Sequence, residues 1–519
     1  MYSLSRRDFL KGAAAGAAVV GAGNWLAACG SSASPSASPT GAPKTGGTIR
    51  AALTGGGDSD TLDALNPISN VDIARVRNLF EPLVDYAPDA SPKLLLAEEM
   101  TPNADGTEWT IRLKPGITWH NGKDLTADDV MYTFRRISDP KSPSAGASSL
   151  TLLDLAAMKK LDALTLRVPC KAPFVTFVSV LPNTYFNIVP DGYDGTDPVG
   201  TGPFTVASFT PGRESVFKKN PNYWQSGWPY VDEVVMTDYA DETSQVNALL
   251  GGQADVVNLL SSSVLSTVTG AGKKLLVSRG GGWTPITMRV DAAPFDDVRV
   301  RQAMRLVVDR QQMIDLVFAG KGTLGNDIFG IWDADYDSEI PQRTPDIEKA
   351  KSLLKEAGRE GLTVEMTTAD IAQGVVSAAQ VFAKQAEAAG ITIKLSKVTV
   401  TEFYGNNYLK WVFAQDYWYY NGYLPQVAQA TLPNAPFNET HWNDDRYNKL
   451  YDEALSTVDA TKRAEIAREM QAIEHNEGGY IIPYFPPVID GYAPNVNGLV
   501  ESKSGAALNN YRFREMWLS

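Results

Sequence analysis

Helices and short strands alternate through the second half of the chain, and this order constrains the fold more than any other feature of its 519 residues. Between residues 375 and 389, apolar residues recur at helical spacing, and Gly390 ends the pattern. A strictly alternating run, residues 391–395, follows directly. Residues 347–357 and 362–366 repeat the same order of helix and strand. Alternating helices and strands pack as layers, so the sequence predicts an α/β fold here.

The remainder of the chain shows the same two patterns, helical spacing of apolar residues and alternation of apolar and polar residues. Alternation of apolar and polar residues predicts strands at 48–53, 109–113, 164–168 and 231–236, with another beginning at 201–204. Helical spacing predicts helices at 71–83, 126–137, 242–250, 297–318 and 461–475. About 470 residues follow the first 47, which is enough chain for two or more lobes, each with its own core.

Aromatic residues crowd into one stretch, residues 403–423, which reads FYGNNYLKWVFAQDYWYYNGY. Ten of its 21 residues are aromatic, against 10% in the whole chain. Tyr and Trp combine a large apolar body with a hydrogen-bonding tip, which suits the wall of a site for an organic ligand. A buried core strand is the alternative reading. Consecutive side chains of a strand face opposite sides, so the run Tyr417-Trp418-Tyr419-Tyr420 favours a ligand cleft on one face.

The first 28 residues have the features of an export leader. Ser5-Arg6-Arg7-Asp8-Phe9-Leu10-Lys11 resembles a twin-arginine signal, and an Ala- and Gly-rich apolar run follows it. That run is too short to span a membrane, which takes ~20 residues. Leu26-Ala27-Ala28-Cys29 resembles a lipobox, which implies that Cys29 becomes the lipidated first residue. We therefore expect a signal peptide at 1–28 and a lipid anchor at Cys29, outside the cytoplasmic membrane.

Residues 29–47 are rich in Ser, Ala, Pro and Gly and predict a flexible tether. If Cys29 carries lipid, Cys170 is the only other cysteine, so no intramolecular disulfide can form. The net charge of −13 argues against a nucleic-acid partner, because nucleic-acid binding needs basic patches.

A search for catalytic or metal-binding patterns finds little. The three histidines, His120, His441 and His475, lie far apart and have no metal-ligand spacing. The chain has neither a G-x-S-x-G elbow nor a phosphate-binding G-x-x-x-x-G-K-[ST] loop. The carboxylate pairs 128–129 and 444–445 are explained by acidic residues at helix starts. We therefore expect a protein that is not an enzyme and that carries no cofactor and no metal, although carboxylates distant in sequence could still act together.

Four segments together resemble the extracytoplasmic solute-binding proteins of ABC importers, family 5, which includes the dipeptide- and oligopeptide-binding proteins. They are WTIRLKPGITWHNGKDLTADDV at 109–130, GTGPF at 200–204, NPNYW at 220–224 and PFDDVRVRQA at 294–303. Residues 346–354 also resemble the A-K-x-L-L helix of that family. The matches occur in family order and cover nearly all of the chain after residue 48.

The resemblance implies a periplasmic-binding-protein-like fold of class II type, with two lobes that close around a ligand by hinge motion. It implies a first lobe at 48–284 and 488–519, with an extra subdomain at about 84–197, and a second lobe at 285–487. The crossing near Trp283 follows Gly280-Gly281-Gly282. The implied partners are a small-molecule or peptide ligand and the permease subunits and ATPase of an ABC importer. We expect a monomer.

The resemblance also places the ligand contacts on the aromatic stretch. Peptide-binding members tend to carry a W-x-x-D-Y-P-D pattern there, whose first aspartate pairs with the peptide α-ammonium. In this chain Asn421 stands at that place, and an amide cannot supply the charge of that contact. The candidate ligand-binding residues are Trp418, Tyr419, Tyr420, Asn421, Tyr404 and Trp283, with Ser69 and Asn70 from the loop after the first strand.

The predicted function is therefore that of a substrate-binding lipoprotein that delivers a peptide or another small organic solute to a permease. Two alternatives stay open at this point. One is a membrane-anchored hydrolase whose aromatic stretch lines a substrate groove, and the other is a receptor that senses a solute without delivering it.

Overall fold

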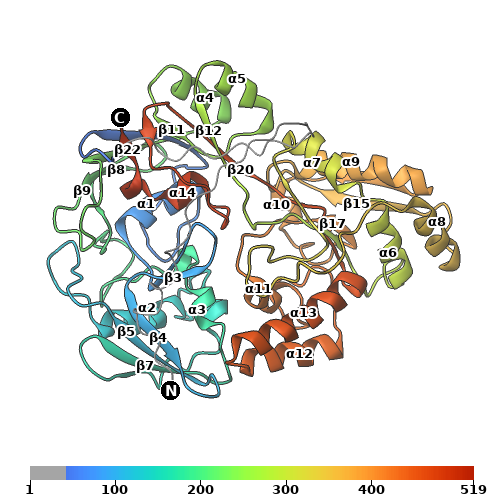
Figure 1. The fold of residues 1–519 in the computed structure, drawn as a ribbon, viewed down its shortest axis with the longest axis horizontal. Helices are drawn as coiled ribbons and strands as arrows, with labels where there is room; N and C mark the ends of the chain where they lie inside the picture. The colour runs from blue at the N-terminus through green and yellow to red at the C-terminus, as the bar shows by residue number, and fades with distance from the viewer. Residues whose placement is uncertain (1–41) are drawn as a thin grey trace, which may run out of the picture. The chain divides into compact units, whose positions relative to one another are not determined.

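The computed structural model describes residues 42–519, which form one compact unit. The predicted leader and Cys29 lie outside the described residues. No helix within residues 42–519 is long and apolar enough to cross a membrane. Figure 1 shows helices and strands mixed throughout this part of the chain, as the α/β prediction requires.

A seven-stranded sheet with the order β12-β20-β11-β1-β10-β9-β8 organises the first lobe. The central strand β1 pairs in parallel with both β10 and β11. The strands of this seven-stranded sheet are β1 (Thr48–Thr54), β8 (Phe204–Thr210), β9 (Glu214–Lys219), β10 (Glu233–Tyr239), β11 (Val256–Val257), β12 (Lys274–Ser278) and β20 (Val488–Tyr492). The helices that accompany this sheet are α1 (Asn70–Leu79), α4 (Glu242–Leu250), α5 (Leu265–Gly270) and α14 (Ala507–Tyr511).

A four-stranded antiparallel sheet with the order β4-β5-β7-β6 lies within the same lobe. Its strands are β4 (Ala97–Pro102), β5 (Glu108–Leu113), β6 (Lys159–Lys160) and β7 (Thr165–Pro169), and the hairpin β2 (Val84–Tyr86) and β3 (Pro92–Leu94) precedes them. Trp109, Phe134 and Phe177 pack edge to face in its core, where α2 (Ala127–Ile137) and α3 (Phe177–Val180) lie. The described core of the first lobe continues from this sheet into the seven-stranded one.

The second lobe is built on a five-stranded sheet with the order β16-β15-β17-β13-β18. Its strands are β13 (Ile286–Met288), β15 (Thr363–Thr368), β16 (Thr392–Lys397), β17 (Phe413–Gln415) and β18 (Tyr480–Ile481), with the pair β14 (Thr323–Leu324) and β19 (Tyr484–Phe485) beside it. In Figure 1 the helices α6 (Val298–Leu306), α8 (Ile347–Glu356) and α9 (Val375–Ala386) lie with β15. The others are α7 (Arg310–Phe318), α10 (Val400–Phe403), α11 (Tyr423–Ala430), α12 (Asp445–Ser456) and α13 (Ala460–Glu477).

The chain passes between the two larger sheets twice. It leaves the seven-stranded sheet at Ser278 and enters the five-stranded sheet at Ile286, and it returns to the seven-stranded sheet with β20. The short strands β21 (Val496–Asn497) and β22 (Trp517–Leu518) pair near the end of the chain.

Three predicted elements differ from the observed ones. The predicted helix at 297–318 is two helices, because Asp309 caps α7 by accepting a hydrogen bond from the Gln312 N–H. The helix predicted at 71–83 ends at Leu79, where Phe80 turns to an extended conformation. The run Tyr417–Tyr420 is not a regular strand, since β17 ends at Gln415 and the chain then continues as an extended segment with one isolated bridge.

Candidate ligand-binding site

Residues 416–422 join β17 to α11 and have no regular secondary structure apart from one isolated bridge at Trp418. Two backbone hydrogen bonds fix the middle of this segment, because Trp418 N–H donates to Trp283 O at 2.8 Å and Trp283 N–H donates to Trp418 O at 3.0 Å. The segment ends at Gly422, whose φ of +76° is in the region that favours glycine. This anchoring holds the four candidate residues 418–421 on the edge of the second lobe.

Trp283 lies in the connection between the two larger sheets and packs against the core of the second lobe. It is 2% exposed and stacks on Phe329 at a ring-centroid distance of 5.0 Å. The Trp283 ring also lies parallel to the Trp418 ring, with ring centroids 5.8 Å apart and an interplanar angle of 10°. Trp283 therefore supports Trp418 from behind, while Trp418 itself is only partly buried.

Tyr420 and Asn421 contact the first lobe. The Tyr420 ring lies 5.6 Å from the ring of Tyr86, and the residue is buried in a small cluster with Ala90. Asn421 accepts a hydrogen bond from Asn183 Nδ2 at 3.3 Å and donates one to Gln426 Oε1 at 3.1 Å. These two candidates hold the lobes in contact.

Tyr419 is the candidate most open to solvent, with 60% of the residue exposed. Burial nevertheless raises the pKa of its hydroxyl, and the nearby Tyr417 raises it further. The Tyr417 ring contacts the Tyr419 ring edge to face at 5.6 Å.

Two tyrosines of the first lobe lie near Tyr419. Tyr185 and Tyr511 both lie near enough to Tyr419 to raise its pKa through their charge when ionised. Tyr185 lies in the short 3₁₀ helix Thr184–Phe186. Tyr511 ends α14, and its hydroxyl accepts a hydrogen bond from Asn258 Nδ2 at 3.3 Å. The sequence reasoning missed both residues, because nothing in their local sequence places them opposite residues 416–422.

Tyr404 lies behind this segment. Its hydroxyl donates a hydrogen bond to Asp416 Oδ1 at 2.6 Å, and its ring contacts the ring of Tyr408 edge to face at 5.0 Å. Tyr404 is 36% exposed, so it links the buried Asp416 to the surface.

The structure gives Ser69 and Asn70 a role in α1. Ser69 is the N-cap of that helix, and its hydroxyl accepts a hydrogen bond from the Asp72 N–H at 3.0 Å. Asn70 is the first residue of the helix. Within residues 42–519 the Ser69 hydroxyl has this one hydrogen-bond partner, so capping accounts for it.

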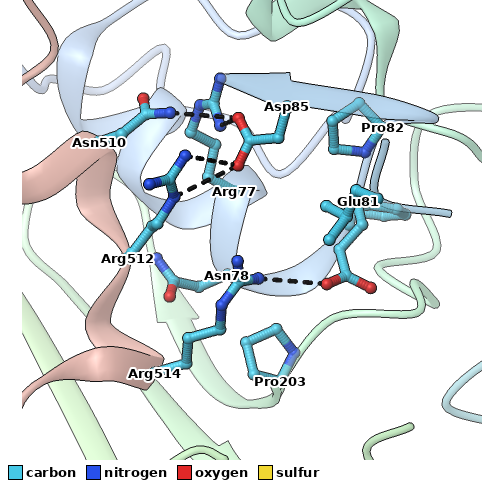
Figure 2. Close-up of a pocket in the computed structure, with 11 residues that line it drawn as sticks. Arg77, Asn78, Glu81, Pro82, Asp85, Pro203, Asn510, Arg512 and Arg514 are labelled. Carbon is cyan, nitrogen blue, oxygen red and sulfur yellow. Dashed lines mark hydrogen bonds and ion pairs between the residues drawn. The ribbon is translucent and has the colours of Figure 1, made fainter. Parts of the chain in front are cut away.

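A small cavity lies in the first lobe, among three arginines (Figure 2). Asp85 accepts hydrogen bonds from Arg77 at 3.1 Å and from Arg512 at 2.9 Å. Glu81 pairs with Arg514 at 3.2 Å. The cavity volume of about 10 Å³ holds no more than a water-sized group. Because each arginine has a carboxylate partner, this cluster fastens the C-terminal segment to β2 and α1.

No group of three His, Cys, Asp or Glu side chains among residues 42–519 is arranged to hold a metal ion. The polar groups at the edge of the second lobe are hydroxyls and amides on aromatic and neutral side chains. Such a surface can bind an organic ligand by stacking and hydrogen bonding.

Comparison with known proteins identifies the family. The sequence profile described as bacterial extracellular solute-binding proteins, family 5 middle, matches residues 91–446, and a twin-arginine signal-sequence profile matches residues 3–23. The chain belongs to this family. It is a solute-binding protein of the ABC-importer type, with an export signal at its N-terminus, and it is not an enzyme.

Two curated relatives and one solved structure illustrate the similarity. Heme-binding protein A of Haemophilus influenzae is 27% identical over 83% of this chain and 86% of its own length. The dipeptide-binding protein of Escherichia coli is 25% identical over 79% of this chain and 84% of its own. The crystal structure of the ABC transporter substrate-binding protein CtaP from Listeria monocytogenes is 19% identical and covers 92% of this chain and 100% of its own, with a TM-score of 0.80. The fold is therefore the two-lobed one that the sequence predicted.

Proposed function

We propose that this solute-binding protein captures a peptide or another small organic solute between its lobes, against residues 417–421. The observation that carries the proposal is the position of Tyr419, which is 60% exposed beside a residue that contacts the first lobe and has Tyr185 and Tyr511 of that lobe nearby. A ligand held between these rings gains stacking and hydrogen bonds from both lobes at once. Trp418 supplies a further face for stacking, and Asn421 supplies an amide.

The ligand class is proposed from the relatives and from Asn421. One relative is named for heme and another for dipeptides, so related proteins accommodate ligands of different shape. The amide oxygen of Asn421 accepts a hydrogen bond from Asn183, and its NH₂ group donates one to Gln426. Because Asn421 carries an amide and not a carboxylate, a charged partner for the α-ammonium of a free peptide has to come from another residue.

We further propose lobe limits of 48–284 with 488–519 and of 285–487, with the subdomain at about 84–197. These limits fit the places where the chain passes between the two larger sheets, after Ser278 and before Val488. Closure about these two connections would place Tyr420 on Tyr86 and Asn421 on Asn183.

The anchor and the partners complete the proposal. A lipid on Cys29 would hold the protein at the outer face of the cytoplasmic membrane as a monomer, next to a permease and an ATPase to which it delivers its ligand. The tether at 29–47 would let the lobes reach that permease.

The experiment has two steps. Native mass spectrometry of the purified protein identifies the ligand that it carries from its host. Calorimetry with that ligand then compares the wild type with Tyr419→Ala and with Leu316→Ala, an exposed apolar residue on α7. We expect Tyr419→Ala to weaken binding about tenfold or more and Leu316→Ala to leave it unchanged. Equal affinity in all three proteins would refute the proposed site.

A further inference from the structure

Two carboxyl groups lie buried beside the candidate site without a cationic partner. Asp416 is 3% exposed and Glu439 is 6% exposed. Asp416 directly follows β17 and begins the extended segment that carries Tyr417–Asn421. Among the ion pairs of residues 42–519, none includes either of these carboxylates. Buried carboxylates without a counter-charge are costly, so this pair needs an explanation.

Each carboxyl group has one oxygen that accepts a hydrogen bond from a tyrosine, and the two groups lie close enough to share a proton with one another. Asp416 Oδ1 accepts hydrogen bonds from the Tyr404 hydroxyl at 2.6 Å and from the Tyr417 N–H at 2.8 Å. Glu439 Oε2 accepts one from the Tyr480 hydroxyl. Asp416 Oδ2 and Glu439 Oε1 are buried and make no hydrogen bond to a donor of the described residues, and the buried indole N–H of Trp418, near Glu439, is unpaired as well. The tyrosine hydrogen bonds fix both groups and leave one oxygen on each with no partner other than the proton that the pair shares.

Both side chains line one small cavity of about 10 Å³. That volume holds one water-sized group, and an –NH₃⁺ group is of this size. The rings of Phe403, Tyr408 and Trp411 form part of the same lining. Aromatic faces attract a cation, and acceptor oxygens give it hydrogen bonds, so the cavity has both elements of an ammonium site.

The charges around the cavity favour an added positive group. Burial raises the pKa of both carboxyl groups, and the charge of Asp416 raises that of Glu439 further. The titratable groups that face the pair are the hydroxyls of Tyr404, Tyr408 and Tyr480, and burial raises the pKa of each, so they stay neutral. The pair therefore holds a proton when no cation is present, and a cation can take its place.

We propose that Asp416 and Glu439 form a subsite that binds a primary ammonium group of the ligand. This inference deepens the proposed function and rests on it for the position of the ligand. Binding transfers the proton that the two carboxyl groups share to the buffer and leaves the ammonium between two carboxylates. The subsite supplies the negative charge that Asn421 does not.

The first test uses methylammonium chloride alone, so its result does not depend on the ligand. Thermal unfolding of the purified protein is followed at pH 7.5 in methylammonium, sodium and tetramethylammonium chloride at equal ionic strength. We expect methylammonium to raise the unfolding midpoint above that in either other salt, because tetramethylammonium is too large for the cavity. The double variant D416N/E439Q keeps the acceptor oxygens that face Tyr404 and Tyr480, and we expect it to lose this difference.

The matched control is Glu474→Gln. Glu474 is another buried carboxyl group of the second lobe, and it also accepts a hydrogen bond from a tyrosine, Tyr423, but it does not line the cavity. We expect Glu474→Gln to keep the methylammonium effect. An equal midpoint in all three salts for the wild type, or an effect that persists in D416N/E439Q, would overturn the subsite.

The second test distinguishes the sources of the ammonium. Calorimetry compares trialanine, which has an α-ammonium, with acetyl-Ala-Lys-Ala-amide, which has only a side-chain ammonium, and with acetyl-Ala-norleucine-Ala-amide, which has none. We expect one of the first two to bind at least tenfold more tightly than the third, with proton release that differs between buffers of different ionisation enthalpy. Binding of all three with equal affinity would overturn the subsite. Failure of all three to bind, with the methylammonium effect intact, would instead count against a peptide as the ligand.

Discussion

Trp418 lies parallel to Trp283, with ring centroids 5.8 Å apart, and the two residues also exchange a pair of backbone hydrogen bonds. The side-chain stack and the backbone pair act on the same two residues. One of them, Trp283, belongs to the connection that leaves the seven-stranded sheet, and the other belongs to the segment that meets the first lobe. The position of the aromatic segment is therefore fixed by the core and not by the ligand.

Substitutions of Trp283 and Tyr419 should separate stability from binding. Trp283→Ala removes a fully packed ring and should cost ~3–5 kcal/mol of unfolding free energy. Tyr419→Ala removes a side chain that is 60% exposed and should change that free energy by less than about 0.5 kcal/mol. Urea unfolding measures both values, and calorimetry with the co-purified ligand measures affinity. A large stability loss in Tyr419→Ala would show that this ring is part of the core.

Asn421→Asp should restore a negative charge at the edge of the second lobe. The substitution leaves one oxygen to accept from Asn183 and removes the donor to Gln426. A charge-assisted hydrogen bond is worth ~1.5–3 kcal/mol, so free tripeptides should bind about ten- to a hundredfold more tightly to the variant if their α-ammonium reaches it. Calorimetry with tripeptides and their N-acetylated forms gives the comparison. Submicromolar binding of free tripeptides to the wild type, with no change in the variant, would contradict this reading of position 421.

Ligand binding should also change the separation of the lobes. Two contacts join the lobes, one between Tyr420 and Tyr86 and one between Asn421 and Asn183. A ligand can favour this closed arrangement only by binding it more tightly than the open one. Small-angle scattering should show a smaller radius of gyration with the co-purified ligand than after its removal. Tyr420→Ala should weaken this change, because it removes one contact of the closed arrangement. An equal radius with and without ligand would argue against hinge closure.

Local periodicity predicted most of the second lobe. The helix at 375–389 and the strands on either side of it are present as α9, β15 and β16, because their apolar residues face one core. The strand predicted for Tyr417–Tyr420 is wrong, since aromatic density does not by itself give a strand its hydrogen-bond partners. Between Gln415 and the start of α11 at Tyr423, the one β-bridge is that from Trp418 to Trp283.

The sequence placed Trp418–Asn421 and Trp283 among the candidates, and the structure brings these residues together, while their role in ligand binding stays a prediction. It could not identify Tyr185 and Tyr511, whose position depends on the packing of the first lobe, nor the pairing of Asp416 with Glu439, which depends on the turn after α11. Tyr511 follows Leu508, Asn509 and Asn510, and all four residues have positive φ. Asparagine tolerates this conformation, but neither Leu508 nor Tyr511 signals it. Ser69 was named as a binding residue from its place after the first strand, and the structure shows that its hydroxyl caps α1.

The leader predicts two separable effects on localisation. Arg6 and Arg7 changed to Lys should block export, because a twin-arginine signal requires both arginines. Cys29→Ala should let export proceed and release the protein from the membrane, because the lipid is its proposed anchor. Fractionation followed by immunoblotting distinguishes cytoplasm, membrane and medium or periplasm. Retention of Cys29→Ala in the membrane fraction would contradict the lipid anchor.

The stability of the second lobe should depend on pH through Glu474. Burial raises the pKa of this carboxyl group to about 8, well above its usual value, although Tyr423 donates a hydrogen bond to it. A carboxyl group whose pKa is raised by folding favours the folded state while it is protonated in both states, and this contribution is lost as pH rises toward the folded pKa. Glu474→Gln removes the charge and keeps the acceptor oxygen for Tyr423. The variant should therefore match the wild type near pH 4 and become the more stable protein between pH 5 and about 8, by ~1 kcal/mol or more. Urea unfolding of both proteins across this range measures the difference. A constant difference from pH 4 to 8 would mean that Glu474 does not titrate abnormally.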